Sequence, residues 1–245
     1  MSGQSLLGAP LLGDGTLLIA ERFGVEVPTF QGEGPSTGQP ALFIRCSRCN
    51  LTCTGCDTKQ TWDWSQYQPA EVSTRETVAE LARWALSSPV ELVVVTGGEP
   101  LIQQQRLLPL VRELLAAGRR IEFETNGTIG PDPELLVDGV RFNVSPKLES
   151  FGADESRSIV PAALAAFAAS GRAAFKFVAT GPDDLGRIAD LVEEHRLAPV
   201  WVMPEGTTAE AVIATTRAIA DQVAARRWCL TTRLHTLAFE NASGR

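Results

Sequence analysis

The sequence has 245 residues and lacks any apolar run of the roughly 18 residues that a membrane-spanning helix needs. It also lacks an excess of positive charge. Its 22 Lys and Arg face 29 Asp and Glu, and the net charge of −7 argues against a broad electrostatic contact with nucleic acid. No linker or low-complexity stretch divides the chain. These absences favour one α/β domain with a full core.

Cysteine is scarce as well. Five cysteines, an odd number, in a chain too large to need covalent staples argue against a disulfide framework. Cys229 stands alone in a strand-like run and is predicted to be a buried core thiol. We expect residues 1–15 to form a flexible tail and residues 16–245 a single domain. Because free clustered cysteines suit a reducing compartment, we expect the protein in the cytoplasm.

The other four cysteines lie close together. Cys49, Cys53 and Cys56 follow the spacing C-x3-C-x2-C, and Cys46 precedes them. Three such thiolates suit one [4Fe–4S] cluster with one iron left open, where a small molecule binds and is reduced. Two alternatives remain: a cluster closed by Cys46, and a zinc site. Zinc sites usually separate their two ligand pairs by about 12–20 residues, far more than here.

Strand-like and helix-like segments alternate after residue 40, which predicts a parallel sheet with right-handed crossovers. The expected strands cover residues 41–45, 91–95, 120–124, 140–144, 173–179, 200–203 and 228–232. The expected helices cover residues 73–86, 103–117, 160–169, 183–195 and 208–225. Ser73 and Glu76 are predicted to cap the first helix. We therefore expect an α/β fold, a partial, open β/α barrel of about six parallel strands.

Unusual residues follow the ends of these strands. They are Cys49–Thr58, Thr96–Pro100 (TGGEP), Thr125–Gly127 (TNG), Ser145–Lys147 (SPK) and Met203–Gly206 (MPEG). The carboxyl ends of parallel strands converge at one mouth, so we expect the chemistry there. Paired glycines let a ligand approach the backbone closely, and Glu99 is a candidate to hold an ammonium group.

The cysteine spacing followed by Gly-Gly-Glu-Pro resembles radical S-adenosylmethionine enzymes. The resemblance implies that Cys49, Cys53 and Cys56 hold a [4Fe–4S] cluster whose open iron binds S-adenosylmethionine. It further implies one-electron cleavage of that cofactor to a 5′-deoxyadenosyl radical, with Gly97–Glu99 lining the cofactor site. The protein's task in such enzymes is to position the cofactor and shield the radical.

A larger ordered set of motifs is similar to the 7-carboxy-7-deazaguanine synthase family over residues 20–235. The set is FQGEG at 30–34, Arg45, CDT at 56–58, ETNGT at 124–128 and SPK at 145–147. The resemblance implies a lyase that rearranges 6-carboxy-5,6,7,8-tetrahydropterin into 7-carboxy-7-deazaguanine and ammonia, on the route to queuosine. It also implies Mg²⁺, a homodimer, and a low-potential electron donor such as flavodoxin or ferredoxin.

The resemblance gives each matching residue a role. Substrate contacts would be Phe30, Gln31, Gly32, Arg45 and Thr96. Cofactor contacts would be Gly55, Cys56, Asp57, Gly98, Ser145, Pro146 and Lys147. Glu124 would be catalytic, and Thr58 would be a ligand of Mg²⁺, which prefers oxygen. The guanidinium of Arg45 suits a carboxylate, and the amide of Gln31 suits the edges of a pterin.

The chain departs from the family beside the first cluster cysteine. Arg48 stands where a small residue, often Gly, is usual, and Cys46 adds a thiol. Near the C-terminus, His235 is either a substrate contact or a packed histidine, and Met203–Gly206 would close over the adenine.

Two competing functions remain open. One is a radical activase that abstracts hydrogen from a partner protein, and the other is an iron–sulfur electron carrier without enzymatic activity. The segment 31–34 and Arg45 argue against the activase, because a glycyl loop offers no carboxylate to bind.

Overall fold

The computed structural model describes residues 15–240, 242 and 244, so the tail expected at residues 1–15 lies outside the described part except for Gly15. The strands are β1 (Thr16–Phe23), β2 (Thr29–Phe30), β3 (Pro40–Cys46), β4 (Thr74–Thr77), β5 (Leu92–Gly97), β6 (Arg120–Thr125), β7 (Val140–Val144), β8 (Ala173–Ala179), β9 (Val200–Pro204) and β10 (Cys229–Leu230). The helices are α1 (Pro69–Val72), α2 (Val78–Leu86), α3 (Gln104–Ala116), α4 (Glu155–Ser158), α5 (Pro161–Ser170), α6 (Asp184–His195), α7 (Ala209–Ala225) and α8 (Leu234–Phe239). None of the helices within this range has the length and apolar character that crossing a membrane requires.

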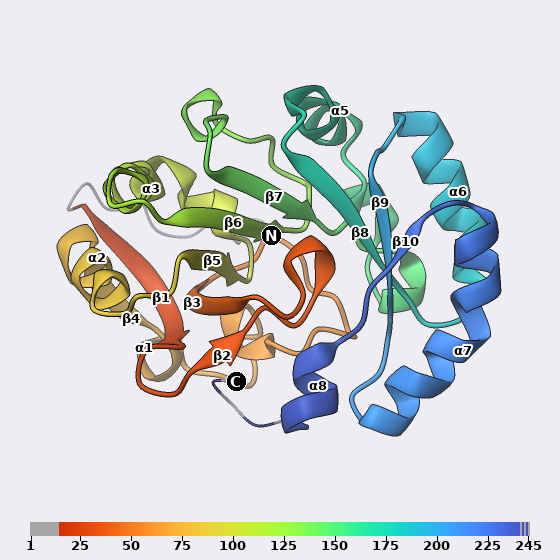
Figure 1. Cartoon of the computed structure of the whole chain (residues 1–245), viewed down its shortest axis with the longest axis horizontal. Coiled ribbons are helices and arrows are strands. Elements are labelled where there is room, and N and C mark those ends of the chain that lie inside the picture. The colour runs from red at the N-terminus through yellow and green to blue at the C-terminus, as the bar shows by residue number, and fades with distance from the viewer. Residues whose placement is uncertain (1–14, 241, 243, 245) are drawn as a thin grey trace, which may run out of the picture.

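The strands form one sheet in the order β10-β9-β8-β7-β6-β5-β3-β1-β4, with β2 paired to β3. Neighbours from β3 to β10 run parallel, whereas β1 pairs antiparallel with β3 and β4. Figure 1 shows α2, α3, α5, α6 and α7 along the outside of the curved sheet. The sheet stays open, which confirms the predicted partial barrel of six parallel strands, extended by the two residues of β10.

The antiparallel side of the sheet departs from the prediction. β1 was not expected. Its buried side chains, Leu17 and Ile19, alternate as in a strand, but the apolar Leu18 between them hides this alternation in the sequence. The predicted capping box at Ser73 is wrong, because residues 74–77 pair with β1 as β4. The box lies four residues later, where Thr77 caps α2 together with Glu80.

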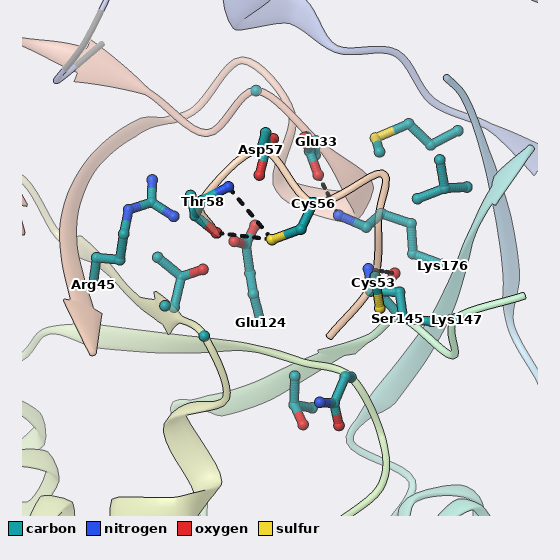
Figure 2. Close-up of a pocket in the computed structure, with 18 of the residues that line it drawn as sticks. Glu33, Arg45, Cys53, Cys56, Asp57, Thr58, Glu124, Ser145, Lys147 and Lys176 are labelled. Carbon is teal, nitrogen blue, oxygen red and sulfur yellow. Dashed lines mark hydrogen bonds and ion pairs between the residues drawn. The ribbon is translucent and has the colours of Figure 1, made fainter. Parts of the chain in front are cut away.

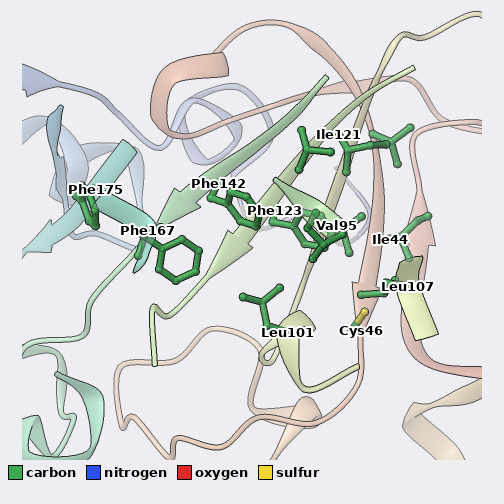
Figure 3. Packing of buried hydrophobic residues seen from close by; sticks show 14 of the residues in the cluster. Ile44, Cys46, Val95, Leu101, Leu107, Ile121, Phe123, Phe142, Phe167 and Phe175 are labelled. Carbon is green, nitrogen blue, oxygen red and sulfur yellow. The ribbon is translucent and has the colours of Figure 1, made fainter. Parts of the chain in front are cut away.

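The main core lies between the sheet and the outer helices (Figure 3). Phe123 and Phe142 stack with ring centroids 5.5 Å apart, and Phe167 of α5 lies 5.3 Å from Phe142. Cys46 belongs to this core and is fully buried. Cys229 is exposed instead of buried, because β10 forms the edge of the sheet.

Successive side chains of β3 face opposite sides of the sheet, as in any strand. Ile44 and Cys46 contribute to the core beneath the helices. Phe43 and Arg45 line a cavity on the inner side of the barrel instead. The strand therefore separates the thiol of Cys46 from the side that carries the polar residues.

The aromatic core predicts a large effect of one substitution. Phe123→Ala should lower the free energy of unfolding by about 3–5 kcal/mol, because it removes a fully buried ring. Val137→Ala, at a side chain that is 39% exposed, should change it by less than about 0.5 kcal/mol. Urea unfolding of both variants measures the difference. Equal costs would show that the ring contributes little.

Candidate active site

One cavity at the carboxyl ends of the parallel strands brings together most of the predicted site residues; Glu99, Pro146, Pro204 and Gly206 do not line it. The residues that line it are Phe30, Gln31, Gly32, Arg45, Cys49, Cys53, Gly55, Cys56, Asp57, Thr58, Thr96, Gly98, Glu124, Ser145 and Lys147. They come from the ends of β2, β3, β5, β6 and β7 and from the loop after β3. Figure 2 shows Cys56, Thr58 and Glu124 near one another in this cavity, with Arg45 to one side.

The three cysteines of the C-x3-C-x2-C loop all face this cavity. The backbone N–H groups of Leu51 and Thr58 point at the sulfurs of Cys49 and Cys56, each at 3.4 Å. Burial raises the pKa of the Cys49 thiol to about 12. A thiol that coordinates a metal ion loses its proton outright. Soft thiolates from one loop, with N–H donors aimed at them, fit an iron–sulfur cluster.

The alternatives that use Cys46 or zinc gain no support. Cys46 packs in the helix-side core and does not line the cavity. Burial, followed by the charge of Glu99, raises its pKa to about 12. Within the described part of the chain, no three His, Cys, Asp or Glu side chains are grouped as ligands of a single metal ion.

Two glycines let the end of β5 touch the end of β3. Gly97 has a φ of +144°, and a Cβ on it would lie 2.2 Å from the carbonyl oxygen of Cys46. A Cβ on Gly98 would lie 2.2 Å from the carbonyl oxygen of Arg48. The backbone N–H groups of Gly98 and Glu99 donate to these same two carbonyls, at 3.1 and 2.8 Å. Any larger residue would separate the glycine turn from the cysteine loop.

Arg48 has a backbone conformation that explains the small residue expected there. Its φ of +80° lies in the left-handed region, which glycine adopts without strain and other residues adopt at a cost of about 1–2 kcal/mol. The hydrogen bond that its carbonyl accepts from Glu99 holds it in place.

Glu99 does not have the role expected for it. Its side chain is fully buried and is absent from the cavity wall. The carboxylate accepts hydrogen bonds from the backbone N–H of Leu101 (2.9 Å), the backbone N–H of Asn126 (2.7 Å) and the hydroxyl of Thr125 (2.8 Å). The prediction that it holds a ligand ammonium is therefore wrong. It ties the glycine turn to the Thr-Asn-Gly turn after β6.

Gln31 lies on the floor of the cavity and is buried. Its Nε2 donates to Glu122 at 2.8 Å and to Glu124 at 3.0 Å, and its Oε1 accepts from the backbone N–H of Glu33 at 3.2 Å. The amide that we expected to meet the edge of a pterin is thus already bonded within the protein. In this structure the hydrogen bond from the Gln31 amide holds the carboxylate of Glu124 in place.

Arg45 is held in place through one of its guanidinium nitrogens. Its Nε donates to Glu21 at 2.7 Å, and its guanidinium carbon lies 5.9 Å from the ring centroid of Phe23. The register of β1 and β3 pairs Glu21 directly with Arg45, next to a bulge in β1. The two terminal nitrogens have no hydrogen-bond partner among the described residues, so they remain free for an anionic group.

Charged residues that sequence reasoning missed close the far side of the cavity. Lys176 of β8 is buried and pairs with Glu33 (Figure 2). Burial raises the pKa of Glu33, but attraction to Lys176, Arg233 and His235 outweighs it, and the net pKa falls well below its usual range. Arg233 also donates to Asp57 at 2.6 Å. A single lysine within the apolar strand Ala173–Ala179 was the signal available for this network.

His235 agrees with both roles considered for it. It lines the cavity, and it packs so closely on Gly32 that a Cβ there would lie 2.1 Å from its Nδ1. Burial lowers its pKa, which favours the neutral imidazole. Met203 and Glu205, from the segment expected to close over an adenine, line the same cavity.

Comparisons with known proteins return similar sequences and structures. A family model described as the radical SAM superfamily matches residues 43–151. A 7-carboxy-7-deazaguanine synthase from Pyrobaculum aerophilum is 37% identical over 89% of this chain and 94% of the relative. Another from Halobacterium salinarum is 34% identical over 87% of this chain and 88% of the relative. The crystal structure of QueE from Escherichia coli aligns with a TM-score of 0.69 and 26% identity, over 91% of this chain and 96% of that one.

The burial of Glu99 predicts a pH dependence of stability. Burial raises its pKa from 4.5 to about 7, against the three hydrogen bonds that it accepts. The folded protein therefore binds this proton more tightly than the unfolded chain, and its contribution to stability falls as pH rises between about 4.5 and 7. Glu99→Gln cannot titrate, so its unfolding free energy should lack this decline in urea titrations.

The matched control is Glu91→Gln, whose parent side chain is 71% exposed. This variant should keep the pH profile of the original protein. A Glu99→Gln profile parallel to that of the original protein would contradict the assignment.

Proposed function

We propose that this chain, which belongs to the 7-carboxy-7-deazaguanine synthase family of radical S-adenosylmethionine proteins, is a lyase acting on a carboxylated pterin. It converts 6-carboxy-5,6,7,8-tetrahydropterin into 7-carboxy-7-deazaguanine and releases ammonia, a step toward queuosine and other 7-deazapurines. The observation that carries the proposal is the convergence of the cysteine loop, the glycine turn and Arg45 on one cavity.

Cys49, Cys53 and Cys56 would hold the [4Fe–4S] cluster. Gly55, Asp57, Gly98, Ser145, Pro146 and Lys147 would surround S-adenosylmethionine beside it. When bound, these groups supply one-electron cleavage of a carbon–sulfur bond and hence a carbon radical. Gly97 and Gly98 both line the cavity, and because they lack side chains the cysteine loop can pack directly against the glycine turn. Pro146 does not line the cavity and would act by shaping the turn between its two neighbours.

The substrate side of the cavity would be formed by Phe30, Gln31, Gly32, Arg45 and Thr96. The free terminal nitrogens of Arg45 suit the pterin carboxylate through a two-point contact. Phe30 packs on Phe239 of α8, with ring centroids 5.1 Å apart, which fixes the position of its ring at the cavity wall. Glu124 would be the catalytic residue, since its carboxylate faces the cavity and accepts from Gln31.

We propose that Thr58 is a ligand of Mg²⁺. The hydroxyl of Thr58 lies 3.5 Å from the sulfur of Cys56, at the wall of the cavity. Magnesium prefers oxygen and keeps several waters, so one protein hydroxyl together with substrate oxygens is a reasonable shell. The ion would clamp the substrate carboxylate.

We also propose a single functional domain over residues 16–245, a homodimer, a cytoplasmic location, and a flavodoxin or ferredoxin as electron donor. The acidic net charge and the five free cysteines are compatible with this setting.

An anaerobic assay tests the proposed function. The reconstituted, reduced protein should form 7-carboxy-7-deazaguanine from 6-carboxytetrahydropterin and S-adenosylmethionine without any protein partner. Cleavage of S-adenosylmethionine without this product would support the assignment to the radical enzymes and contradict the assignment of the pterin as substrate. A requirement for a second protein that is not an electron donor would favour the activase.

The cysteine assignment predicts opposite outcomes for neighbouring thiols. Cys53→Ser should lose most of the bound iron and sulfide, because it removes one of three ligands. Cys46→Ser, the matched control in the helix-side core, should retain a full cluster. Iron and sulfide analysis with the visible absorption of the reconstituted proteins measures both. Cluster loss in Cys46→Ser alone would reverse the assignment.

The role of Thr58 predicts a selective defect. Thr58→Ala should raise the Mg²⁺ concentration needed for half-maximal product formation by about tenfold, roughly the loss of one ligand hydrogen bond or charge contact. S-adenosylmethionine cleavage should change much less. Thr58→Ser should restore the response, and the exposed Thr52→Ala should leave it unchanged. An unchanged Mg²⁺ response in Thr58→Ala would remove Thr58 from the metal site.

A further inference from the structure

Glu122 and Glu124 lie two residues apart on β6, so their side chains face the same inner side of the barrel. One amide group joins them: Nε2 of Gln31 donates to Oε1 of Glu122 at 2.8 Å and to Oε1 of Glu124 at 3.0 Å. An amide nitrogen has two hydrogens, and this geometry uses both. The orientation of the Gln31 amide and the position of the Glu124 carboxylate are therefore coupled.

Glu122 is the member of this hydrogen-bond network that lies behind the cavity wall. It is buried, with 4% of its surface exposed, and does not line the cavity. Its second oxygen accepts from the hydroxyl of Ser36 at 2.5 Å. Both carboxylate oxygens are thus bonded on different sides, which fixes the rotation of the group. The surrounding charges are the cation of Lys176 and the carboxylate of Glu124, and neither makes a hydrogen bond to Glu122.

Glu124 is the part of the network that reaches the ligand space. Oε1 accepts from Gln31, whereas Oε2 has no hydrogen-bond partner in the described part of the chain and is available at the cavity. Without Glu122, one N–H of the Gln31 amide would be buried with no acceptor. The amide would then rotate or shift to recover a partner, because an unsatisfied buried donor is costly. Glu124 would lose its fixed position.

We propose that Glu122 is a positioning residue for the reaction, which acts through Gln31 to aim the free oxygen of Glu124 at the substrate. The inference rests on the proposed function for its kinetic consequence, whereas the coupling of Glu122 to Gln31 stands on geometry alone. Glu122 itself touches neither substrate nor cofactor.

The kinetic test compares two substitutions at the same position. Glu122→Ala should lower kcat for the deazapurine product by about ten- to a hundredfold, the range expected from misplacing a reacting group, with little change in KM. Glu122→Gln should restore most of the activity. Its carbonyl accepts from Gln31 and its amide donates to Ser36, so the shape and both hydrogen bonds survive.

Asn143→Ala is the matched structural control. Asn143 is a buried polar residue on the neighbouring strand, directly opposite Glu124, and its amide makes no hydrogen bond among the described residues. Its removal should leave kcat within about threefold, because the Gln31 network stays intact. Equal losses in Glu122→Ala and Asn143→Ala would overturn the proposal and leave only a general requirement for a well-packed barrel.

A double substitution tests whether Glu122 acts through Gln31. If it does, Glu122→Ala combined with Gln31→Ala should be no slower than Gln31→Ala alone, since residues in one network are not additive. Losses that multiply would show that the two residues act independently and would overturn the proposal.

A readout independent of turnover separates failure of this inference from failure of the proposed function. In the isotope-labelled protein, the side-chain amide hydrogens of Gln31 should exchange slowly with solvent and should exchange at least about tenfold faster in Glu122→Ala. Unchanged exchange would contradict the coupling even in a fully active enzyme. Faster exchange in a protein that forms no deazapurine would support the coupling of Glu122 to Gln31 and contradict the proposed substrate.

Discussion

The backbone contact between the ends of β3 and β5 is the constraint on which the site depends. Gly97 and Gly98 allow it, because a Cβ at either position would collide with a carbonyl of the cysteine loop. Glu99 then fastens this junction to the turn after β6 through bonds to Thr125 and Asn126. Three consecutive strand ends are held at fixed distances before any ligand enters. This preorganisation is what a cofactor that generates a radical requires from its protein.

Charge compensation organises the opposite wall. Lys176 is buried and its partner Glu33 is largely buried, and Arg233 connects Glu33 to Asp57 in the cysteine loop. Buried ion pairs contribute little net stability, because desolvation offsets much of their attraction. Their value here is geometric: they join the segment after β10 to the loop that carries the cysteines. The C-terminal part of the chain and the cysteine loop thus take part in the same cavity.

The parallel half of the fold was predictable because its strands are rich in apolar and β-branched residues and are followed by polar motifs. The same rule placed nearly all the site residues at one mouth. The prediction was wrong for β4, because the capping signature at Ser73 resembles the one that forms at Thr77. It was also wrong for Cys229, because its strand lies at the edge of the sheet. The role predicted for Glu99 was also wrong, because a sequence motif does not show in which direction a side chain points. Lys176 and Glu122 were missed because their partners are distant in sequence.

Cys49, Cys53 and Cys56 would ligate three irons of the cluster and leave the fourth open to S-adenosylmethionine. Electron paramagnetic resonance of the reduced, reconstituted protein, recorded with and without S-adenosylmethionine, tests it most directly. We expect a clear shift of the cluster signal on addition of the cofactor, since the open iron would gain new ligands. An identical signal in both samples would contradict it and would mean that the protein already ligates every iron.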